Sequence, residues 1–187
     1  MAIDLGTGDG RAVLAAARRE PRTLALGMDA NAAAMAEASR RAAALPRKGG
    51  LPNVRFVVAA AESAPKDLAG VATVLTVRFP WASLLRGCVG LDEAVAAGVA
   101  SLVAGGGTLE LLLAPSARDG LDGVPTEPDA IAAAAVRTFG AFGFDPVDAR
   151  PATDDEIFAS GSTWAKRLRS QRPADRPVML VRLVRAP

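Results

Sequence analysis

Hydrophobic positions along the chain fall into two kinds of stretch, short apolar runs and longer alanine-rich segments. The apolar runs predict seven strands, placed at Ala2–Leu5, Leu24–Asp29, Val54–Val58, Ala72–Val77, Thr108–Leu113, Phe144–Ala149 and Val178–Val184. The alanine-rich segments predict helices at Asp9–Arg19, Ala30–Leu45, Leu91–Val103, Pro128–Phe142 and Ser162–Arg172. Strands that alternate with helices are typical of βαβ units. We therefore expect one α/β domain over residues 1–187, with a seven-stranded, mostly parallel sheet and helices on both faces.

Glycine and proline clusters predict where these elements end. Gly105, Gly106 and Gly107 follow the helix predicted over Leu91–Val103, and we expect them to cap that helix and turn the chain. Residues 115–128 predict one long loop and residues 46–52 a shorter one.

Composition excludes several classes of protein. No apolar run approaches the roughly 20 residues of a membrane span, and the N-terminus lacks the pattern of a signal peptide. A single cysteine, Cys88, excludes an intrachain disulfide, and a chain without histidine lacks the usual zinc ligand sets. We expect a cytoplasmic, monomeric protein with no membrane partner and no metal.

The net charge of +2 hides two basic clusters. One runs from Trp164 to the C-terminus, where seven basic residues oppose a single acid, and the other comprises Arg40, Arg41, Arg47 and Lys48. Such clusters indicate either solvated faces or a surface that binds a polyanion, and the sequence leaves both readings open.

A glycine loop, "DLGTGDG", follows the first predicted strand and precedes a helix. Glycines there permit a tight turn and close approach of a ligand to the backbone. Dinucleotide sites use the spacing G-x-G-x-x-G, whereas this loop reads G-x-G-x-G, with Asp9 positioned to repel a pyrophosphate. S-adenosylmethionine has a sulfonium and an ammonium but no phosphate, so we expect it to bind at residues Asp4, Gly6, Thr7, Gly8, Asp9 and Gly10.

A second acid supports a nucleoside site. Asp29 lies nineteen residues past Gly10, at the end of the second predicted strand, where this geometry places a carboxylate on the ribose hydroxyls. Ala30 follows it, and Ala61 and Glu62 lie beyond the third strand, where we expect them to meet the adenine. The alternative is that Asp4 and Asp29 merely cap helices.

Both tryptophans lie among loop-forming residues, Trp81 in "RFPWASLLRG" and Trp164 in "GSTWAKRL". Each either fills a gap in the core or lies at the ligand-binding edge of the sheet. An enzyme that modifies a base must extrude the base and stack it between planar groups, which two tryptophans beside basic clusters would permit.

The stretches "DLGTGDG", "PRKGGLPN", "FPWASLLRG" and "STWAKRL" resemble the aminoglycoside-resistance 16S rRNA methyltransferases that modify N1 of adenine 1408, and the similarity spans nearly the whole chain. The resemblance implies a Rossmann-like class I fold, S-adenosylmethionine as methyl donor with S-adenosylhomocysteine as product, and the 30S subunit with its 16S rRNA as partner. It implies that Trp81 and Trp164 clasp the flipped adenine with Pro80 beside them, that Ser162 or Thr163 positions the loop, and that Phe79 lies at the cofactor. It also implies an rRNA-binding set formed by Arg41, Arg47, Lys48, Arg86, Lys166, Arg167 and Arg172.

The sequence departs from the family pattern at three places. The family's N-terminal β-hairpin has no counterpart before Met1, so we expect either that this docking surface is missing or that the start is assigned too late. Ala82 replaces the usual glycine after the first tryptophan, and Arg78 stands where an apolar residue is expected. Two alternatives therefore stay open: a methyltransferase acting on a small molecule, and a cofactor-binding protein that docks on the ribosome without methylating it.

Overall fold

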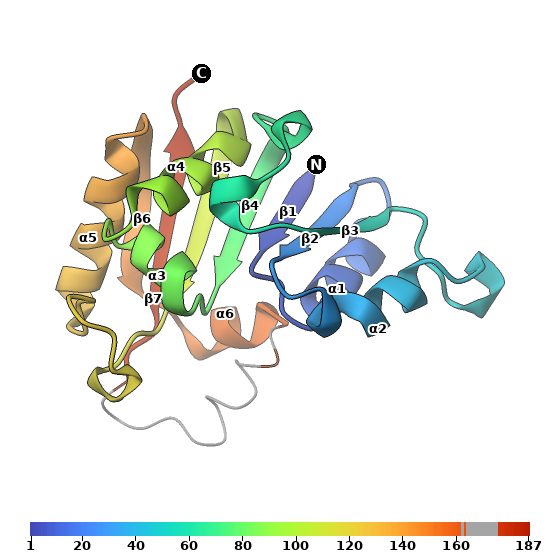
Figure 1. Ribbon diagram of the computed structural model, residues 1–187, viewed down its shortest axis with the longest axis horizontal. Helices are drawn as coiled ribbons and strands as arrows, with labels where there is room; N and C mark the ends of the chain where they lie inside the picture. The colour runs from blue at the N-terminus through green and yellow to red at the C-terminus, as the bar shows by residue number, and fades with distance from the viewer. Residues whose placement is uncertain (162, 164–175) are drawn as a thin grey trace.

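The computed structural model describes residues 1–161, 163 and 176–187, which contain one seven-stranded sheet (Figure 1). The strand order is β3-β2-β1-β4-β5-β7-β6. The strands are β1 (Ala2–Leu5), β2 (Ala25–Asp29), β3 (Val54–Val58), β4 (Ala72–Arg78), β5 (Val103–Leu113), β6 (Phe144–Pro151) and β7 (Met179–Arg185). Only β7 runs antiparallel to its neighbours, so the prediction of a mostly parallel sheet is confirmed.

Helices cover both faces of the sheet, as expected (Figure 1). One face carries α3 (Ala82–Cys88), α4 (Glu93–Leu102) and α5 (Pro128–Gly140). The other face carries α1 (Arg11–Arg19), α2 (Ala32–Ala42) and α6 (Asp154–Ala159). Four single turns of 3-10 helix, η1 (Pro46–Lys48), η2 (Ala61–Ser63), η3 (Lys66–Leu68) and η4 (Ala117–Asp119), lie in the connections.

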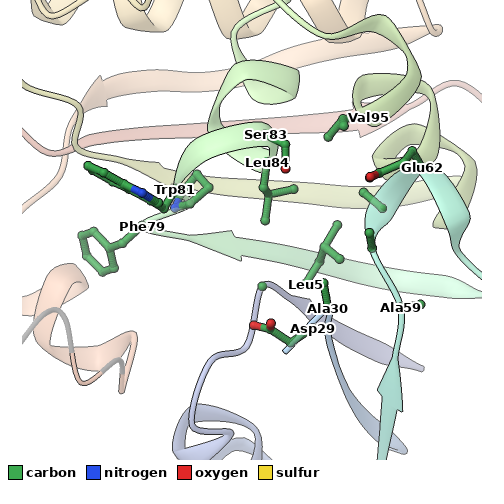
Figure 2. Close-up of a pocket in the computed structure, with 14 residues that line it drawn as sticks. Leu5, Asp29, Ala30, Ala59, Glu62, Phe79, Trp81, Ser83, Leu84 and Val95 are labelled. Atoms are coloured by element: carbon green, nitrogen blue, oxygen red, sulfur yellow. The ribbon is translucent and has the colours of Figure 1, made fainter. Parts of the chain in front are cut away.

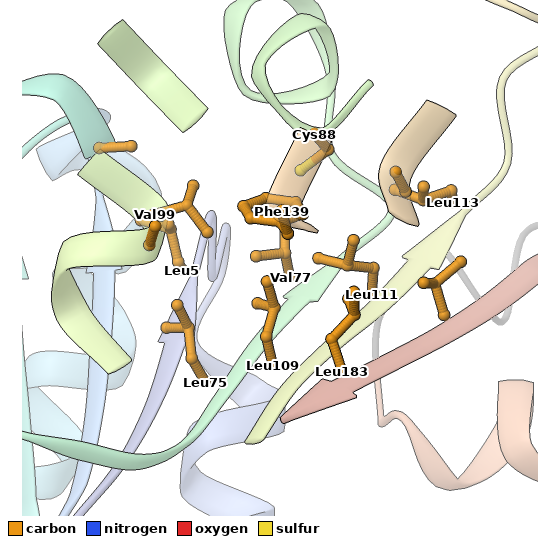
Figure 3. Packing of buried hydrophobic residues seen from close by; sticks show 14 of the residues in the cluster. Leu5, Leu75, Val77, Cys88, Val99, Leu109, Leu111, Leu113, Phe139 and Leu183 are labelled. Carbon is orange, nitrogen blue, oxygen red and sulfur yellow. The ribbon is translucent and has the colours of Figure 1, made fainter. Parts of the chain in front are cut away.

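The main core lies between the sheet and the helices α3, α4 and α5 (Figure 3). Leucines of β4 and β5 meet Val99 of α4 and Phe139 of α5 there. Phe139 is fully buried, and its ring meets that of Phe144 edge to face at 5.9 Å between centroids. Burial of such rings removes a large apolar area from water, and this layer therefore anchors the strands whose ends form the site.

Two short helices were not predicted, α3 with seven residues and α6 with six. Neither is long enough for its apolar period to stand out from the neighbouring loop. The helix predicted over Ala30–Leu45 starts later, because the Asn31 side chain accepts a hydrogen bond from Ala34 N and caps it. The predicted helix at Ser162–Arg172 lies outside the described residues, apart from Thr163.

The prediction that the glycine triplet caps a helix is wrong. Helix α4 ends at Leu102, and Val103 already has the extended conformation that begins β5. Gly105, Gly106 and Gly107 form a bulge inside this strand, where residues 104–107, four residues of β5, lie opposite the single residue Thr73 of β4. A Cβ on Gly107 would lie 2.7 Å from the Ala72 carbonyl oxygen, so the close approach of β4 explains that glycine.

In the part of the chain that the structure describes, no helix is both long and apolar enough to cross a membrane.

Candidate active site

The glycine loop joins β1 to α1 at the carboxyl edge of the sheet. Gly6, Gly8 and Gly10 all have positive φ, at 72°, 57° and 68°. A Cβ on Gly6 would come 2.7 Å from Leu84 Cδ2, and one on Gly10 would come 2.6 Å from the Phe56 ring. Glycine is thus required at these two positions both by backbone conformation and by space.

Asp4, predicted to meet the cofactor, instead fastens the loop to the sheet. Its side chain is nearly buried and accepts hydrogen bonds from Thr7 Oγ1 at 2.9 Å, Thr76 Oγ1 at 2.8 Å and Arg78 Nη1 at 2.7 Å. Arg78, unexpected in the family pattern, neutralises this carboxylate. Asp4 therefore holds the glycine loop against the sheet, and it is not among the residues that line the cavity described next.

A cavity of about 330 Å³ opens beside the loop (Figure 2). This volume lies within the usual range for a small-molecule site. The wall includes eight of the residues that the sequence predicts for cofactor or base: Gly6, Asp29, Ala30, Ala61, Glu62, Phe79, Pro80 and Trp81. Six residues were missed: Leu5, Ala59, Ala60, Ser83, Leu84 and Val95. Ala59 and Ala60 were detectable as neighbours of Ala61, whereas Ser83 and Leu84 belong to the unpredicted helix α3.

Asp29 both hydrogen-bonds to the glycine loop and lines the cavity. Its Oδ2 accepts a hydrogen bond from Gly8 N at 2.8 Å, and its Oδ1 accepts one from Asn31 N at 2.8 Å. A carboxylate has about four acceptor sites, so Asp29 retains capacity for hydroxyl groups of a ligand. The helix cap of α2 is Asn31 and not Asp29, which removes capping as the reason for this acid.

The cavity wall suits a nucleoside that carries positive charge. Leu5, Leu84 and Val95 provide apolar surface, and the two ionisable groups in the wall among the described residues, Asp29 and Glu62, are both acids. In that part of the chain no lysine or arginine lines the cavity, whereas a phosphate group favours such a partner. S-adenosylmethionine therefore fits the residues present.

The chain turns sharply at Phe79, Pro80 and Trp81, directly after β4. Phe79 and Ala82 have positive φ, 51° and 47°, although neither is glycine. Phe79 N donates to the Leu112 carbonyl at 2.8 Å, and its ring packs on the cluster that contains Ile157 of α6. Trp81 is 52% exposed and lines the cavity. A core-filling role for Trp81 is excluded by this exposure.

A second, much smaller cavity of about 20 Å³ lies on the other side of this turn. Trp81 lines it together with Asp119 and Arg176, whose side chains form an ion pair with Arg176 Nη2 2.5 Å from Asp119 Oδ2. Arg176 Nε also donates to the Ala114 carbonyl at 2.8 Å. This buried pair joins the chain entering β7 to the loop after β5, next to Trp81.

Of the Ser162, Thr163 and Trp164 motif, the structure describes Thr163. Thr163 Oγ1 donates a hydrogen bond of 2.6 Å to Asp9 Oδ2, so Thr163 lies at the glycine loop. Ser162 and Trp164 lie outside the described residues, as do Lys166, Arg167 and Arg172.

The remaining predicted rRNA-binding residues lie on the surface. Arg41 is exposed near the end of α2, and Arg47 and Lys48 are exposed on η1. Gly50 lets this loop fold tightly, since a Cβ there would lie 1.7 Å from the Ala44 carbonyl oxygen. Arg86 is different, because its guanidinium donates to the Asp122 carbonyl at 3.0 Å.

Cys88 offers no nucleophile to this site. The side chain is fully buried in the main core, and burial raises the pKa of its thiol to about 12. Among the described residues, no group of three or more acids and thiols could hold a metal ion.

Comparison with solved structures places the chain among the methyltransferases. It matches a 16S rRNA (adenine(1408)-N(1))-methyltransferase of Catenulisporales acidiphilia, a tryptophan-to-alanine mutant solved with cosubstrate SAM, at a TM-score of 0.85 and 30% identity. That match covers 100% of this chain and 85% of the other. The 16S rRNA methyltransferase KamB matches at a TM-score of 0.85 and 32% identity, covering 100% and 87%.

Sequence comparison identifies the family. The model of the NpmA family, described as 16S rRNA (adenine(1408)-N(1))-methyltransferase, matches residues 1–183. The enzyme of that name from Streptoalloteichus tenebrarius is 33% identical over 175 residues, which cover 91% of this chain and 80% of the relative. Its counterpart in Streptoalloteichus hindustanus is 34% identical over 176 residues with the same coverage. The chain belongs to the NpmA family, so the resemblance seen in the sequence motifs is confirmed.

Proposed function

We propose that this chain is a Rossmann-like class I methyltransferase that methylates N1 of adenine 1408 in 16S rRNA of the 30S subunit, and so protects the ribosome from aminoglycosides. The observation that carries the proposal is one cavity lined both by Gly6 and Asp29, from the predicted cofactor site, and by Trp81, whose side chain is 52% exposed. A methyl donor held by Gly6 and Asp29 would share this cavity with a base held by Trp81.

The cofactor end of the proposed site is built from backbone and carboxylates. Asp29 is assigned to the ribose hydroxyls, and Ala61 and Glu62 to the adenine. Gly6 lets the backbone approach the ligand, while Asp4, Thr7, Gly8 and Gly10 hold the loop in shape. When bound there, S-adenosylmethionine supplies a methyl group activated by the adjacent sulfonium.

The base end of the proposed site aligns the substrate and excludes water. Adenine N1 carries its own lone pair, so the site needs no residue to remove a proton before the new bond forms. Trp81 is assigned to one face of the flipped adenine and Trp164 to the other. Pro80 and the strained backbone around it set the direction of the Trp81 ring. Buried Cys88 takes no part.

Exposed cations of the η1 loop are assigned to the rRNA backbone. Arg47 and Lys48 project from a loop that Gly50 keeps compact, and Arg41 lies close by in sequence on α2. Within the described residues these three side chains have no ion-pair partner, which leaves their charges available for phosphates. Lys166, Arg167 and Arg172 are assigned to the same role on the basis of sequence, and Arg86 to an edge contact.

Transfer of a tritiated methyl group to purified 30S subunits, followed by reverse-transcription mapping, tests this function. We expect incorporation with a single new stop at adenine 1408, and raised aminoglycoside resistance in cells that express the chain. Turnover of a metabolite without incorporation into 30S subunits would favour a small-molecule enzyme. Binding of S-adenosylhomocysteine and of 30S subunits without any transfer would favour a docking protein.

A further inference from the structure

Arg78 ends β4 at the carboxyl edge of the sheet, next to the glycine loop. Leu5 and Val77 are the last paired residues of β1 and β4, so Gly6 and Arg78 are the next residues along these two neighbouring strands. Adjacent strands lie about 4.8 Å apart. Gly6 lines the cavity, and so does Phe79, which follows Arg78 directly. The backbone of Arg78 therefore lies beside the cavity, at the point where β1 and β4 end.

The guanidinium of Arg78 uses only part of its hydrogen-bonding capacity within the described residues. Its Nη1 donates to Asp4 Oδ1 at 2.7 Å, and the same oxygen accepts a bond from Thr76 Oγ1 at 2.8 Å. Its Nε is buried and has no hydrogen-bond partner there, although buried polar groups are normally bonded. Nε and Nη2 form the edge of the guanidinium that matches the two oxygens of a carboxylate. The edge that Asp4 leaves unused is thus suited to a second carboxylate.

The order of the strands sets the direction in which S-adenosylmethionine would lie. The proposed site assigns the adenine to Ala61 and Glu62, which follow β3, and the ribose to Asp29 at the end of β2. The strands follow one another as β3, β2, β1 and β4 (Figure 1). The amino-acid end of the ligand is joined to the far side of the ribose through the sulfonium, so it would reach the ends of β1 and β4, where Arg78 lies.

The other groups near this place are poorly suited to hold a carboxylate. Backbone amides at the start of a helix often bind anions, but four amides of the glycine loop already donate to acceptors of the protein at 2.8–3.2 Å, namely those of Gly6, Thr7, Gly8 and Gly10. Among the described residues, the ionisable groups of the cavity wall are the acids Asp29 and Glu62, which would repel an anion. The α-carboxylate therefore needs a donor from a side chain beyond the wall.

We propose that Arg78 recognises the α-carboxylate of S-adenosylmethionine. The guanidinium keeps its bond to Asp4 through Nη1 and offers Nε and Nη2 to the two carboxylate oxygens. Its side chain is 20% exposed and so accessible in part, and Nε becomes accessible when the guanidinium turns toward the loop. Arg78 stands where the family pattern has an apolar residue, so this recognition is particular to the present chain. The inference rests on the proposed function, because it takes S-adenosylmethionine as the ligand of the cavity.

Two ligands that differ only in the carboxylate test this assignment by calorimetry. Decarboxylated S-adenosylmethionine lacks that group but keeps the sulfonium and the amine. The measured quantity is the ratio of the two Kd values, because any change at Asp4 acts alike on the amine that both ligands share. We expect the parent to prefer S-adenosylmethionine at least tenfold and Arg78→Leu to lower this preference below threefold. Arg78→Lys should keep part of the preference, since its ammonium retains the charge without the fork.

Arg182→Leu is the matched control. Arg182 also forms an ion pair with a carboxylate of the sheet, with Nη2 2.8 Å from Glu110 Oε2, and its loss should leave the preference unchanged. Arg78→Leu leaves the buried carboxylate of Asp4 without a cation, which destabilises the fold. The double variant Asp4→Asn with Arg78→Leu removes both charges and should lose the preference in the same way. Thermal melts check that each variant is folded at the temperature of the titration.

The outcomes separate this inference from the proposed function. A parent that binds both ligands equally, or a folded Arg78→Leu or double variant that keeps the full preference, overturns the role of Arg78 and leaves the proposed function in place. An equal loss in Arg182→Leu also overturns it, because the effect would then not depend on position. Preference through Arg78 in a chain that transfers no methyl group to 30S subunits refutes the proposed function and leaves the role of Arg78 standing. A chain that binds neither ligand refutes both.

Discussion

Two turns at the same edge of the sheet reach similar backbone shapes with different residues. The turn after β1 has positive φ at Gly6, Gly8 and Gly10, all glycines. The turn after β4, the strand hydrogen-bonded to β1, has positive φ at Phe79 and Ala82. A left-handed backbone costs a residue with a Cβ about 1–2 kcal/mol, whereas glycine adopts it freely.

The difference shows what holds each turn in place. The glycine turn is unstrained, and the space around Gly6 and Gly10 leaves no room for a side chain. The turn after β4 is strained and persists because Phe79 packs beside α6 and its amide bonds to β5. Strained residues of this kind concentrate at functional sites, where the surrounding structure enforces them. The first turn is therefore suited to accept a ligand, and the second to present Trp81.

Gly10→Ala should cause the largest change in stability. Its new Cβ would lie 2.6 Å from the Phe56 ring and 2.7 Å from Ala38 Cβ, at a φ of +68°. Overpacking and backbone strain together should lower the free energy of unfolding by about 2–4 kcal/mol. Gly8→Ala is the matched control, because Gly8 also has a positive φ but has open space around it. This variant should lower the free energy of unfolding by about 1 kcal/mol. Equal losses in urea denaturation would show that space is not what selects the glycine at position 10.

Trp81→Ala should separate activity from stability. Because the side chain is 52% exposed, we expect the free energy of unfolding to fall by less than about 1 kcal/mol, whereas a core tryptophan would cost about 3–5 kcal/mol. Loss of stacking worth about 1–3 kcal/mol should lower turnover by about 5- to 150-fold. Val147→Ala, an exposed apolar residue of β6, serves as the control with full activity. A large drop in the melting temperature of Trp81→Ala would contradict a role in clasping the base.

Ala82→Gly should test the strain directly. Glycine relieves the positive φ of 47° but adds freedom to the unfolded chain, so the net gain in the free energy of unfolding should be about 0.5–1 kcal/mol. Ala32→Gly, at the first position of α2, should instead destabilise the protein by up to about 1 kcal/mol. If both variants lose stability in parallel denaturant titrations, the turn after β4 is not strained at Ala82.

Glu156→Gln should have the smallest effect on stability. It changes a residue of α6, the helix beside which Phe79 packs. The hydrogen bond from Arg150, joined by one from Thr153 N, lowers the pKa of Glu156 from 4.5 to about 2. Because the folded pKa lies below the unfolded one, the stabilisation is complete above about pH 5 and is lost as the pH falls from 4.5 toward 2. At pH 7 the free energy of unfolding of the parent should exceed that of Glu156→Gln by no more than about 1 kcal/mol, since the Arg150–Glu156 ion pair is partly exposed. The two stabilities should converge near pH 2, and a gap that persists there would contradict this cause.

Local pattern was sufficient for the larger part of the fold and for the part of the site formed by the glycine loop and Asp29. The seven strands, the glycine loop and Asp29 at the end of β2 follow from apolar runs, glycine spacing and the common edge of parallel strands. These features depend on residues close together in sequence, or on a rule of chain geometry that holds for all sheets of this kind. The loop-forming residues around Trp81 likewise indicated that its side chain is exposed.

Contacts between distant residues decided the rest. The sequence marked Asp4 as a cofactor ligand, but Thr76 and Arg78, more than seventy residues away, occupy its carboxylate. Asp9 likewise bonds to Thr163 instead of lining the cavity. A carboxylate presents the same pattern in sequence whichever donor it meets, and only the folded chain determines which donor lies within hydrogen-bond distance. Residue types and spacing therefore predicted that acids gather at this edge of the sheet, while tertiary structure assigned each of them its partner.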